Sequence, residues 1–348
     1  MFRLFYLSSG LFLLSLLWIF PIACGNGSPS SLAATATATP TNTSCVDGFG
    51  HTCTPTFTPT PAAVYTTSWG INGTGNGQLH FAYGVALSPS GTLYVADSHN
   101  NRIQQFTTIG GYISQWGSSA PATGGGNGQF NDPAGICVDS LGNIYIADTE
   151  NNRIQTFNSS GTYLTQWGNA GNGNGQFDQP YSLALDTAGN LYVADTVNSR
   201  VQKFTTIGGY LGQWGGYGNG NGQFEYVAGV AVDTSNNVYV TDESNCRVQK
   251  FNSSGVYTTQ WGSYGSGNGE FYSPYGIVTD SSNNIYVSDS APNNRIEKFT
   301  SGGTYLGQWG STGSGNGQLV NPYGLAVDGL DNVYVADYGN NRIQVFAP

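Results

Sequence analysis

The sequence predicts an all-β domain, a propeller of six blades with four antiparallel strands in each. Tryptophan recurs beyond residue 64 at positions 69, 116, 167, 214, 261 and 309. An aspartate that follows a Tyr-Val/Ile-Ala/Thr/Ser triplet, and an arginine shortly after it, recur in the same six units. Three markers that each occur six times indicate tandem repeats, and a repeat of this length with four short strands selects a propeller.

The second unit shows the four expected strands most clearly. They cover residues 135–139, 143–148, 153–157 and 162–167, and short turns rich in Ser, Asn and Gly separate them. Within 143–148, Ile144 and Ile146 fall on one side of the expected strand and Tyr145 and Ala147 on the other. Turn signals at this spacing are typical of all-β architectures.

The two ends of the repeat region predict how the ring closes. The chain enters the repeats at residues 64–70, which match the fourth strand of a unit, and it ends at Phe346, which matches the end of a third strand. We therefore expect the N-terminal strand to join the last blade, which leaves no blade incomplete. The propeller is predicted to span residues 64–348.

Residues 1–24 are predicted to be an export segment. Arg3 precedes an apolar run that ends at Phe20, and the segment finishes at Cys24. The pattern resembles a lipoprotein signal, with Cys24 as the lipidation candidate, although Pro21 departs from it. Cleavage by an ordinary signal peptidase and an uncleaved anchor remain open alternatives. We expect an exported protein, lipid-anchored at the cell surface, periplasm or outer membrane or else secreted, that meets the membrane only through this N-terminal anchor.

Residues 25–63 form a predicted linker rich in Thr, Pro and Ala. Proline stiffens such a segment, and its apolar content is too low for a core. Cys45 and Cys53 lie within it, and after export they could form a disulfide or stay as free thiols. A linker of this kind would hold the propeller away from the surface to which it is attached.

Composition excludes several function classes. Glycine accounts for 51 residues without a triplet period, which rules out collagen, and the 22 tyrosines, 17 phenylalanines and 7 tryptophans are too many for a disordered chain. The formal net charge is −10, and the few basic residues recur once or twice in a unit instead of forming a patch. We therefore expect no nucleic-acid partner.

The sixth unit resembles the NHL repeat. It contains Pro-Tyr-Gly at 322–324, Ala-Val-Asp at 326–328, Tyr-Val-Ala-Asp at 334–337, Asn-Asn-Arg-Ile-Gln at 340–344 and Phe346. The resemblance covers roughly residues 64–348 and implies a six-bladed propeller, here of a bacterial exported or lipoprotein type. For function it implies little, because NHL propellers serve as protein-binding, RNA-binding, sensor and occasionally lyase domains.

Residues present in every unit are interpreted as scaffold. The six aspartates and six arginines flank the turn between the second and third strands, where a carboxylate can accept backbone hydrogen bonds and pair with arginine. The six tryptophans are interpreted as packing residues between blades. A residue repeated in every unit usually serves the unit.

Residues that differ between units are better candidates for binding. Four tyrosines share one position at the start of the innermost strand, where phenols could line the channel mouth: Tyr83, Tyr181, Tyr275 and Tyr323. Nearby links and turns add further candidates: His80, His99, Asp178 and Glu225. The wider set of variable positions also contains Phe81, Asp132, Glu150, Tyr226, Glu243 and Tyr338. Packing between blades is the alternative role for the tyrosines.

No complete catalytic site is visible in the sequence. The chain has three histidines, of which His51 lies in the linker, so a histidine-ligated metal is not expected. No nucleophile motif occurs, and we expect no cofactor, although calcium in the channel stays open. The favoured function is a non-enzymatic extracytoplasmic binding platform for a protein, peptide or glycan. The alternatives are a metal-dependent lyase or hydrolase and a purely structural surface protein.

Overall fold

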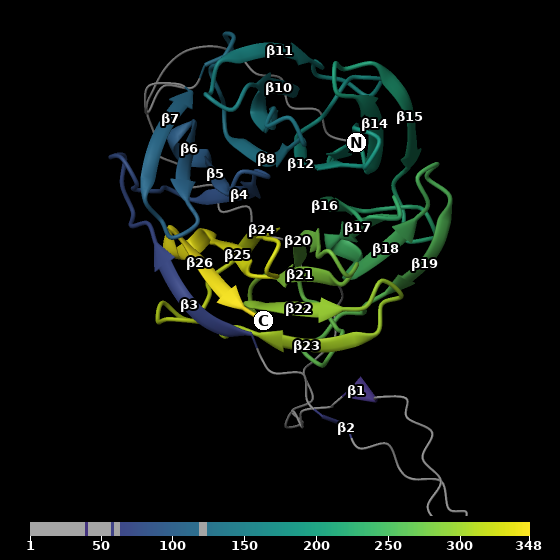
Figure 1. Cartoon of the computed structure of the whole chain (residues 1–348). Helices are drawn as coiled ribbons and strands as arrows, with labels where there is room; N and C mark the ends of the chain where they lie inside the picture. The colour runs from purple at the N-terminus through teal and green to yellow at the C-terminus, as the bar shows by residue number, and fades with distance from the viewer. Residues whose placement is uncertain (1–38, 41–56, 59–62, 118–123) are drawn as a thin grey trace, which may run out of the picture.

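The computed structural model describes residues 39–40, 57–58, 63–117 and 124–348. Residues 64–348 form six four-stranded antiparallel sheets arranged as blades around a central channel, as Figure 1 shows. Two short strands, β1 (Thr39–Pro40) and β2 (Phe57–Thr58), pair with each other outside the ring. The predicted six-bladed all-β propeller is therefore confirmed.

Each blade is a meander that runs from the channel outward. Blade 1 contains β4 (Ala82–Leu87), β5 (Thr92–Asp97), β6 (Arg102–Thr107) and β7 (Tyr112–Gly117). Blade 2 contains β8 (Pro133–Val138), β9 (Ile144–Asp148), β10 (Arg153–Phe157) and β11 (Tyr163–Trp167). Blade 3 contains β12 (Pro180–Leu185), β13 (Asn190–Asp195), β14 (Arg200–Thr205) and β15 (Tyr210–Gly215).

The remaining blades repeat this arrangement. Blade 4 contains β16 (Val227–Val232), β17 (Val238–Asp242), β18 (Arg247–Phe251) and β19 (Tyr257–Trp261). Blade 5 contains β20 (Pro274–Thr279), β21 (Ile285–Asp289), β22 (Arg295–Phe299) and β23 (Tyr305–Trp309). Blade 6 contains β24 (Pro322–Val327), β25 (Val333–Asp337) and β26 (Arg342–Ala347). Single 3-10 turns link the second and third strands of four blades: Ser98–Asn100, Thr149–Asn151, Glu243–Asn245 and Tyr338–Asn340.

The N-terminal strand completes blade 6, as predicted. Strand β3 (Val64–Trp69) pairs antiparallel with β26, so that Trp69 lies opposite Ile343 and Val64 lies opposite Ala347. Since β26 begins at the turn after Asp337, Val64 and Ala347 lie at the opposite end of the blade from that turn. The linker therefore enters the ring on the face away from the turns that join second to third strands.

A hydrophobic cluster fills each of the six interfaces between blades, and each cluster contains one repeated tryptophan. Trp167, at the end of blade 2, has its ring 6.3 Å from that of Phe204 in blade 3. Its ring also lies so close to Gly208 that a Cβ there would come within 2.7 Å of it. The tryptophans thus occupy the packing position expected from the sequence.

Replacing Trp167 by alanine should lower the free energy of unfolding by about 3 kcal/mol or more, because the indole fills an interface between two blades that cannot collapse onto the space left behind. Urea denaturation followed by tryptophan fluorescence measures the loss. The exposed Leu141 supplies the control, since its replacement by alanine should change stability by less than about 0.5 kcal/mol. A loss below about 1 kcal/mol at Trp167 would mean that the tryptophans do not hold the blades together.

The repeated aspartate and arginine form one buried network in each blade. In blade 2, Arg153 Nε lies 2.7 Å from Asp148 Oδ2. The other guanidinium nitrogens donate to the carbonyl oxygens of Gly125, Gly126 and Gln129 in the preceding link, and to Gln166 Oε1 in the fourth strand. The arginine therefore fixes the glycine-rich link, the turn and the outer strand of its own blade, which is a scaffold role.

The innermost strands of neighbouring blades approach one another closely. Glycine occupies one position of this strand in five blades: Gly84, Gly135, Gly229, Gly276 and Gly324. A Cβ at Gly135 would lie only 2.5 Å from the carbonyl oxygen of Tyr181 in the next blade. Blade 3 has Ser182 there, whose hydroxyl accepts a hydrogen bond from the Val230 N–H at 3.1 Å. These small residues let the six strands form a narrow channel.

Candidate ligand-binding face

The glycine-rich links and the turns that follow the second strands share one face of the ring. The Glu150 N–H in a turn donates to the Asn131 carbonyl oxygen in a link at 3.1 Å, and the Glu243 N–H donates to the Tyr226 carbonyl oxygen at 2.9 Å. Each turn therefore rests on the link of its own blade. We call this side the mouth face, and it carries most of the variable positions that the sequence singled out.

The four tyrosines at the start of the innermost strands meet across the channel. The ring centroid of Tyr83 lies 4.9 Å from that of Tyr323 and 5.4 Å from that of Tyr181, and Tyr275 lies 4.4 Å from Tyr323. The sequence led us to expect four phenols on a rim. The structure shows instead that they contact one another, because the channel is narrow and all four side chains project toward its axis.

Two further tyrosines join them from other repeat positions. Tyr338, in the turn of blade 6, lies 4.6 Å from Tyr323, and Tyr226, in the link of blade 4, lies 6.3 Å from Tyr181. Sequence reasoning marked both as variable, but it could not group them with the other four because their repeat positions differ. We call the six residues the tyrosine cluster: Tyr83, Tyr181, Tyr226, Tyr275, Tyr323 and Tyr338.

Phe81, His80 and His99 extend the cluster toward blade 1. The Phe81 ring lies 4.7 Å from Tyr338 and 4.6 Å from His99, and the two histidines are 5.2 Å apart. Phe81 has a φ of 55°, a left-handed conformation that is unusual for a bulky residue. The hydrogen bond from its N–H to Asn341 Oδ1 of blade 6, at 2.7 Å, helps to hold it there. Asp132, Gln179 and Asn321 adopt the same conformation at the equivalent position of their blades, so it belongs to the repeat.

Both histidines of this face are uncharged at neutral pH. Burial is the main factor that lowers the pKa of His80, and the neighbouring His99 lowers it further while Asp97 opposes the shift. Burial also lowers the pKa of His99. The aromatic part of the mouth face therefore carries no positive charge of its own at pH 7.

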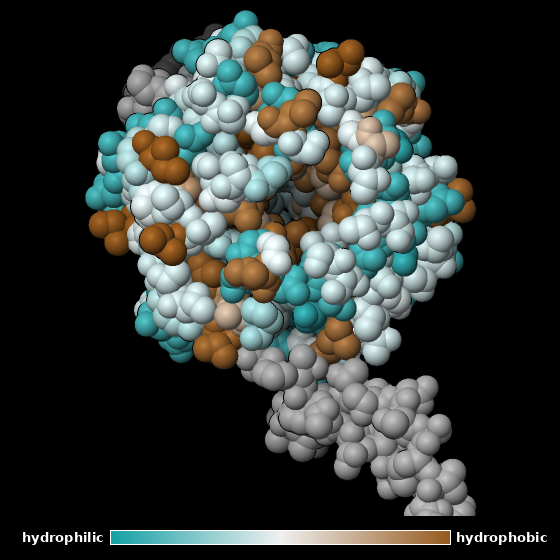
Figure 2. All heavy atoms as spheres, in the orientation of Figure 1, coloured by the Kyte–Doolittle hydropathy of each residue, from teal (hydrophilic) through white to brown (hydrophobic). Residues whose placement is uncertain are grey.

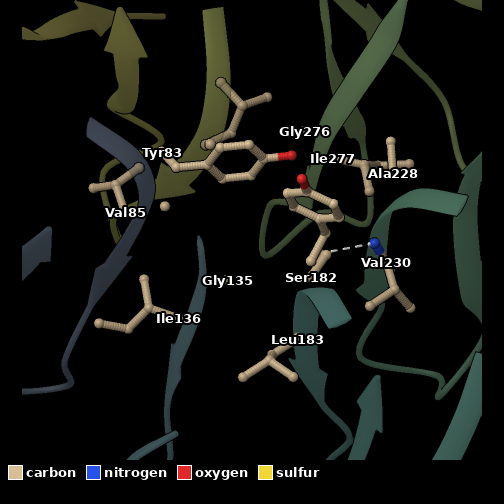
Figure 3. Close-up of a pocket in the computed structure, with 14 residues that line it drawn as sticks. Tyr83, Val85, Gly135, Ile136, Ser182, Leu183, Ala228, Val230, Gly276 and Ile277 are labelled. Carbon is tan, nitrogen blue, oxygen red and sulfur yellow. Dashed lines mark hydrogen bonds between the residues drawn. The ribbon is translucent and has the colours of Figure 1, made fainter. Parts of the chain in front are cut away.

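A cavity lies within the channel next to the tyrosine cluster. It encloses about 450 Å³, including the part that is open to solvent, and its walls contain one aliphatic side chain from each blade: Val85, Ile136, Leu183, Val230, Ile277 and Leu325. Figure 3 shows Tyr83 reaching across this space, with Ile136 and Leu183 on its walls. The Tyr83 hydroxyl is buried and has no hydrogen-bond partner. Figure 2 shows the channel as a hollow at the centre of the ring, with hydrophobic residues in its walls.

Carboxylates stand beside the tyrosines on blades 2 and 4. Asp132 Oδ1 is buried without a hydrogen-bond partner, whereas Glu150 is exposed and accepts a hydrogen bond from Gln179 Nε2 at 3.0 Å. Glu243 is buried and accepts a hydrogen bond from the Ser273 hydroxyl at 2.7 Å. Sequence reasoning did not select these three acids as site residues, because single acids in variable turns carry little signal.

The two acids that the sequence did select lie farther out on the same face. Asp178 is exposed, and its N–H donates to Asp195 Oδ1 at 2.8 Å. Glu225 is exposed and lies 3.4 Å from the Tyr217 hydroxyl. The structure therefore brings Tyr83, Tyr181, Tyr275 and Tyr323 together, places the histidines beside them, and leaves Asp178 and Glu225 at the periphery. Cys24, Cys45 and Cys53 lie outside the described residues.

Burial and nearby charge shift the pKa values of this face. Burial raises the pKa of Asp132 to about 6, and the Glu150 charge adds to the shift. Burial is also the main cause that raises the pKa of Tyr181, with Tyr226, Asp132 and Glu150 contributing. The phenols therefore stay neutral throughout the physiological pH range.

Five of the six blades match the family model of the NHL repeat, over residues 79–106, 130–157, 177–204, 224–251 and 319–346. The domain is an NHL-repeat propeller. The NHL resemblance noted in the sequence is confirmed for five of the six blades of the ring.

Blade 5 of the NHL propeller is the one that the family model does not match. Six positions separate Asp289 from Arg295, against five in the other blades, and the Arg295 Nε to Asp289 Oδ2 distance is correspondingly long, at 3.2 Å. Glu297 also replaces the glutamine found at this position in the other five blades. Both departures lie in the part of blade 5 that corresponds to the matched segments of the other five blades.

The curated relatives match only segments of this NHL propeller. A stretch of 88 residues is 40% identical to peptidyl-glycine alpha-amidating monooxygenase of Mus musculus, which is 24% of this chain and 9% of the relative. A stretch of 43 residues is 42% identical to protein lin-41 of Caenorhabditis elegans, which is 12% of this chain and 4% of that protein. The chain thus spans about a tenth or less of the length of these relatives.

Solved structures share the fold over most of the ring. A Bacteroides thetaiotaomicron protein of unknown function superposes with a TM-score of 0.62 at 18% identity, covering 85% of this chain and 78% of that one. A streptogramin B lyase superposes with a TM-score of 0.57 at 15% identity, covering 82% and 97%, and a putative gluconolactonase with 0.58 at 14%, covering 83% and 93%. At these identities the similarity shows the fold alone.

Within residues 63–117 and 124–348, no three His, Cys, Asp or Glu side chains are grouped so that they could hold a metal ion. In the same part of the chain, no helix has the length and apolar character that crossing a membrane requires.

Proposed function

We propose that this NHL propeller is a non-enzymatic binding platform outside the cytoplasm, and that its ligand is a protein, peptide or glycan that contacts the mouth face. The observation that carries the proposal is the tyrosine cluster. Six phenols from five blades converge at the channel, although the repeat does not require a tyrosine at the shared position, since blades 2 and 4 have Ala134 and Ala228 there. Tyrosines combine a large apolar surface with a polar hydroxyl, which suits them to interfaces.

The entry point of the linker supports this orientation. Val64 begins β3 on the face opposite the mouth, so a chain anchored through residues 1–24 would present the mouth face away from the anchoring surface. The exposed aliphatic side chains of Ile109, Leu141 and Leu330 lie in turns on the face of the linker. A ligand that approaches from outside would therefore meet the tyrosine cluster first.

The proposal is tested by screening the full chain against peptide and glycan arrays together with two double variants. Replacing Tyr323 and Tyr338 by serine should abolish saturable binding, because it removes two adjoining rings of the cluster. The matched control replaces Ile109 and Leu141 by serine on the opposite face and should leave binding unchanged. Binding that survives the tyrosine changes but is lost in the control would contradict the proposal.

A metal-dependent lyase or hydrolase is the second candidate, because a streptogramin B lyase and a putative gluconolactonase share the fold. Elemental analysis of the protein, purified without chelator, separates the two. A tightly held metal at one equivalent per chain would favour the enzyme and direct substrate screening to the channel. We expect less than one tenth of an equivalent, on the order of adventitious contamination.

A further inference from the structure

The mouth face combines aromatic rings and negative charge, and the arginines that lie on it are all paired with aspartates. The rings gather on blades 6 and 1, where Phe81 and Tyr338 lie 4.7 Å apart, and Tyr181 and Tyr226 continue the cluster on blades 3 and 4. Asp132 and Glu150 are close enough to influence the ionisation of Tyr181, and Glu243 that of Tyr275. One compact surface therefore offers both π-faces and carboxylates.

Every lysine and arginine of the described residues is either paired with an aspartate at the mouth face or lies on the opposite face. Of the ten lysines and arginines, Arg3 lies outside the described residues, and the six repeated arginines are each paired with the aspartate of their own blade. Lys203 lies 3.3 Å from Asp186 and Lys298 lies 3.7 Å from Asp280, in both cases at the turn between first and second strands on the opposite face. Lys250 donates to the Ser301 carbonyl oxygen at 3.0 Å, also on that side. Within residues 63–117 and 124–348, no unpaired lysine or arginine lies at the mouth.

Two buried polar atoms lack partners at this place. Asp132 Oδ1 and the Tyr83 hydroxyl oxygen are both shielded from solvent without a hydrogen bond. An unpartnered buried polar atom is costly, and a ligand that supplies the missing partner removes that cost. A ligand that donates hydrogen bonds to a carboxylate oxygen would satisfy Asp132.

We propose that the mouth face recognises an alkylammonium cation, held over the rings of Phe81, Tyr338 and the tyrosine cluster and attracted by Asp132, Glu150 and Glu243. This inference rests on the proposed function and names the chemistry of its ligand. An ammonium group is drawn to the face of an aromatic ring and donates hydrogen bonds to carboxylates, so it uses both features of the surface. A lysine side chain of a partner protein and a free alkylamine present the same group.

The test is a titration of the full chain with n-butylammonium chloride, followed by NMR. 1-Butanol, which has the same chain length without the charge, is the reference ligand. We expect saturable butylammonium binding that weakens about tenfold or more for 1-butanol. Asp132→Asn should weaken butylammonium binding about fivefold, because it removes one of three nearby charges without changing the size of the side chain.

Asp331→Asn is the matched control. Asp331 resembles Asp132 in two ways: its φ is also left-handed, at 62° against 52°, and its Oδ1 is also buried without a partner. It differs in position, because it lies in a turn on the opposite face. The control should bind butylammonium as the unaltered chain does. Equal weakening in both variants would show a non-specific effect of net charge and overturn the proposal, as would equal binding of 1-butanol.

Two further ligands distinguish the sources of the cation. The peptide Gly-Lys-Gly binding at least tenfold more tightly than butylammonium would assign a lysine side chain of a protein partner, and equal affinity would assign a free amine; either result supports the proposal. If the arrays instead give a neutral or anionic ligand that needs Tyr323 and Tyr338, the binding platform stands and the cation inference fails.

Discussion

Deleting residues 64–70 from the full chain should abolish cooperative unfolding and cause aggregation. The deletion removes β3, which is the fourth strand of blade 6, and leaves the edge of β26 without a partner. It also removes Trp69, whose ring lies 6.3 Å from Phe106 of blade 1 and 6.5 Å from Tyr334 of blade 6. We expect a loss of about 5 kcal/mol or more, which is comparable with the whole stability of a typical domain.

Size-exclusion chromatography and urea denaturation measure this effect. The control is a deletion of equal length in the predicted linker, residues 26–32, which should leave the unfolding transition in place. A monomeric protein that unfolds in one transition at the usual urea concentration after losing residues 64–70 would show that β3 does not close the ring. We expect aggregation as well as lost stability, because an exposed edge strand can pair with another chain.

Replacing Glu297 by glutamine should stabilise the protein at pH 8 by roughly 3–5 kcal/mol and change little below pH 4. Glu297 is fully buried, and its Oε1 lies 2.7 Å from Arg295 Nη2 while Oε2 accepts a hydrogen bond from the Gly269 N–H at 3.1 Å. The site thus holds two carboxylates, Glu297 and Asp289, against one guanidinium. Burial raises the pKa of Glu297 to about 8; Arg295 opposes the shift, and Asp289 adds to it.

The sign of the pH dependence follows from that pKa. The carboxyl of Glu297 ionises near pH 4.5 in the unfolded chain and near pH 8 in the folded one, so the unfolded state gains stability relative to the native state between these values. Glutamine does not titrate, so the variant lacks this pH dependence. In blade 2 the glutamine at the equivalent position, Gln155, donates from Nε2 to the Gln129 carbonyl oxygen at 2.7 Å and to Asp148 Oδ2 at 3.0 Å, which shows the bonds that a glutamine makes at this position.

The measurement compares urea denaturation of the two proteins from pH 4 to pH 9, because the difference between them isolates residue 297 from the other titrating groups. Gln249→Glu in blade 4 supplies the reverse exchange and should destabilise the protein with the same pH profile. A stability difference between the Glu297→Gln variant and the unaltered chain that stays constant across this range would contradict the account of blade 5.

Most of the fold could be predicted from the repeats in the sequence. Tryptophan, aspartate and arginine recur because each blade needs the same interface and the same buried network. Their six occurrences predicted six blades. The single fourth strand at the start of the repeats and the missing fourth strand at their end predicted how the ring closes. The irregular blade was also visible in the sequence, since Arg295 stands one position late and Glu297 replaces glutamine. The effect of Glu297 on the pH dependence of stability could be predicted only from the structure, which shows its burial and its ion pair with Arg295.

The candidate site was predictable only in part. The shared position of Tyr83, Tyr181, Tyr275 and Tyr323 placed them at the channel, but the distance across the channel depends on how closely the innermost strands approach. That approach is set by contacts such as the one between Gly135 and the Tyr181 carbonyl; glycine recurs at this position, but its period alone does not give the width of the channel. Tyr226 and Tyr338 reach the same point from other repeat positions, so only the folded ring brings the six tyrosines together.

The most direct test of the account is fluorine NMR on protein labelled with 3-fluorotyrosine, titrated with the strongest ligand that the arrays yield. Single Tyr→Phe substitutions assign the signals. The account predicts that the signals of the tyrosine cluster shift with one common dissociation constant, whereas those of Tyr112 and Tyr163, in outer strands, stay unchanged. A ligand that shifts the outer-strand signals and leaves the cluster untouched would show that the mouth face is not the binding site.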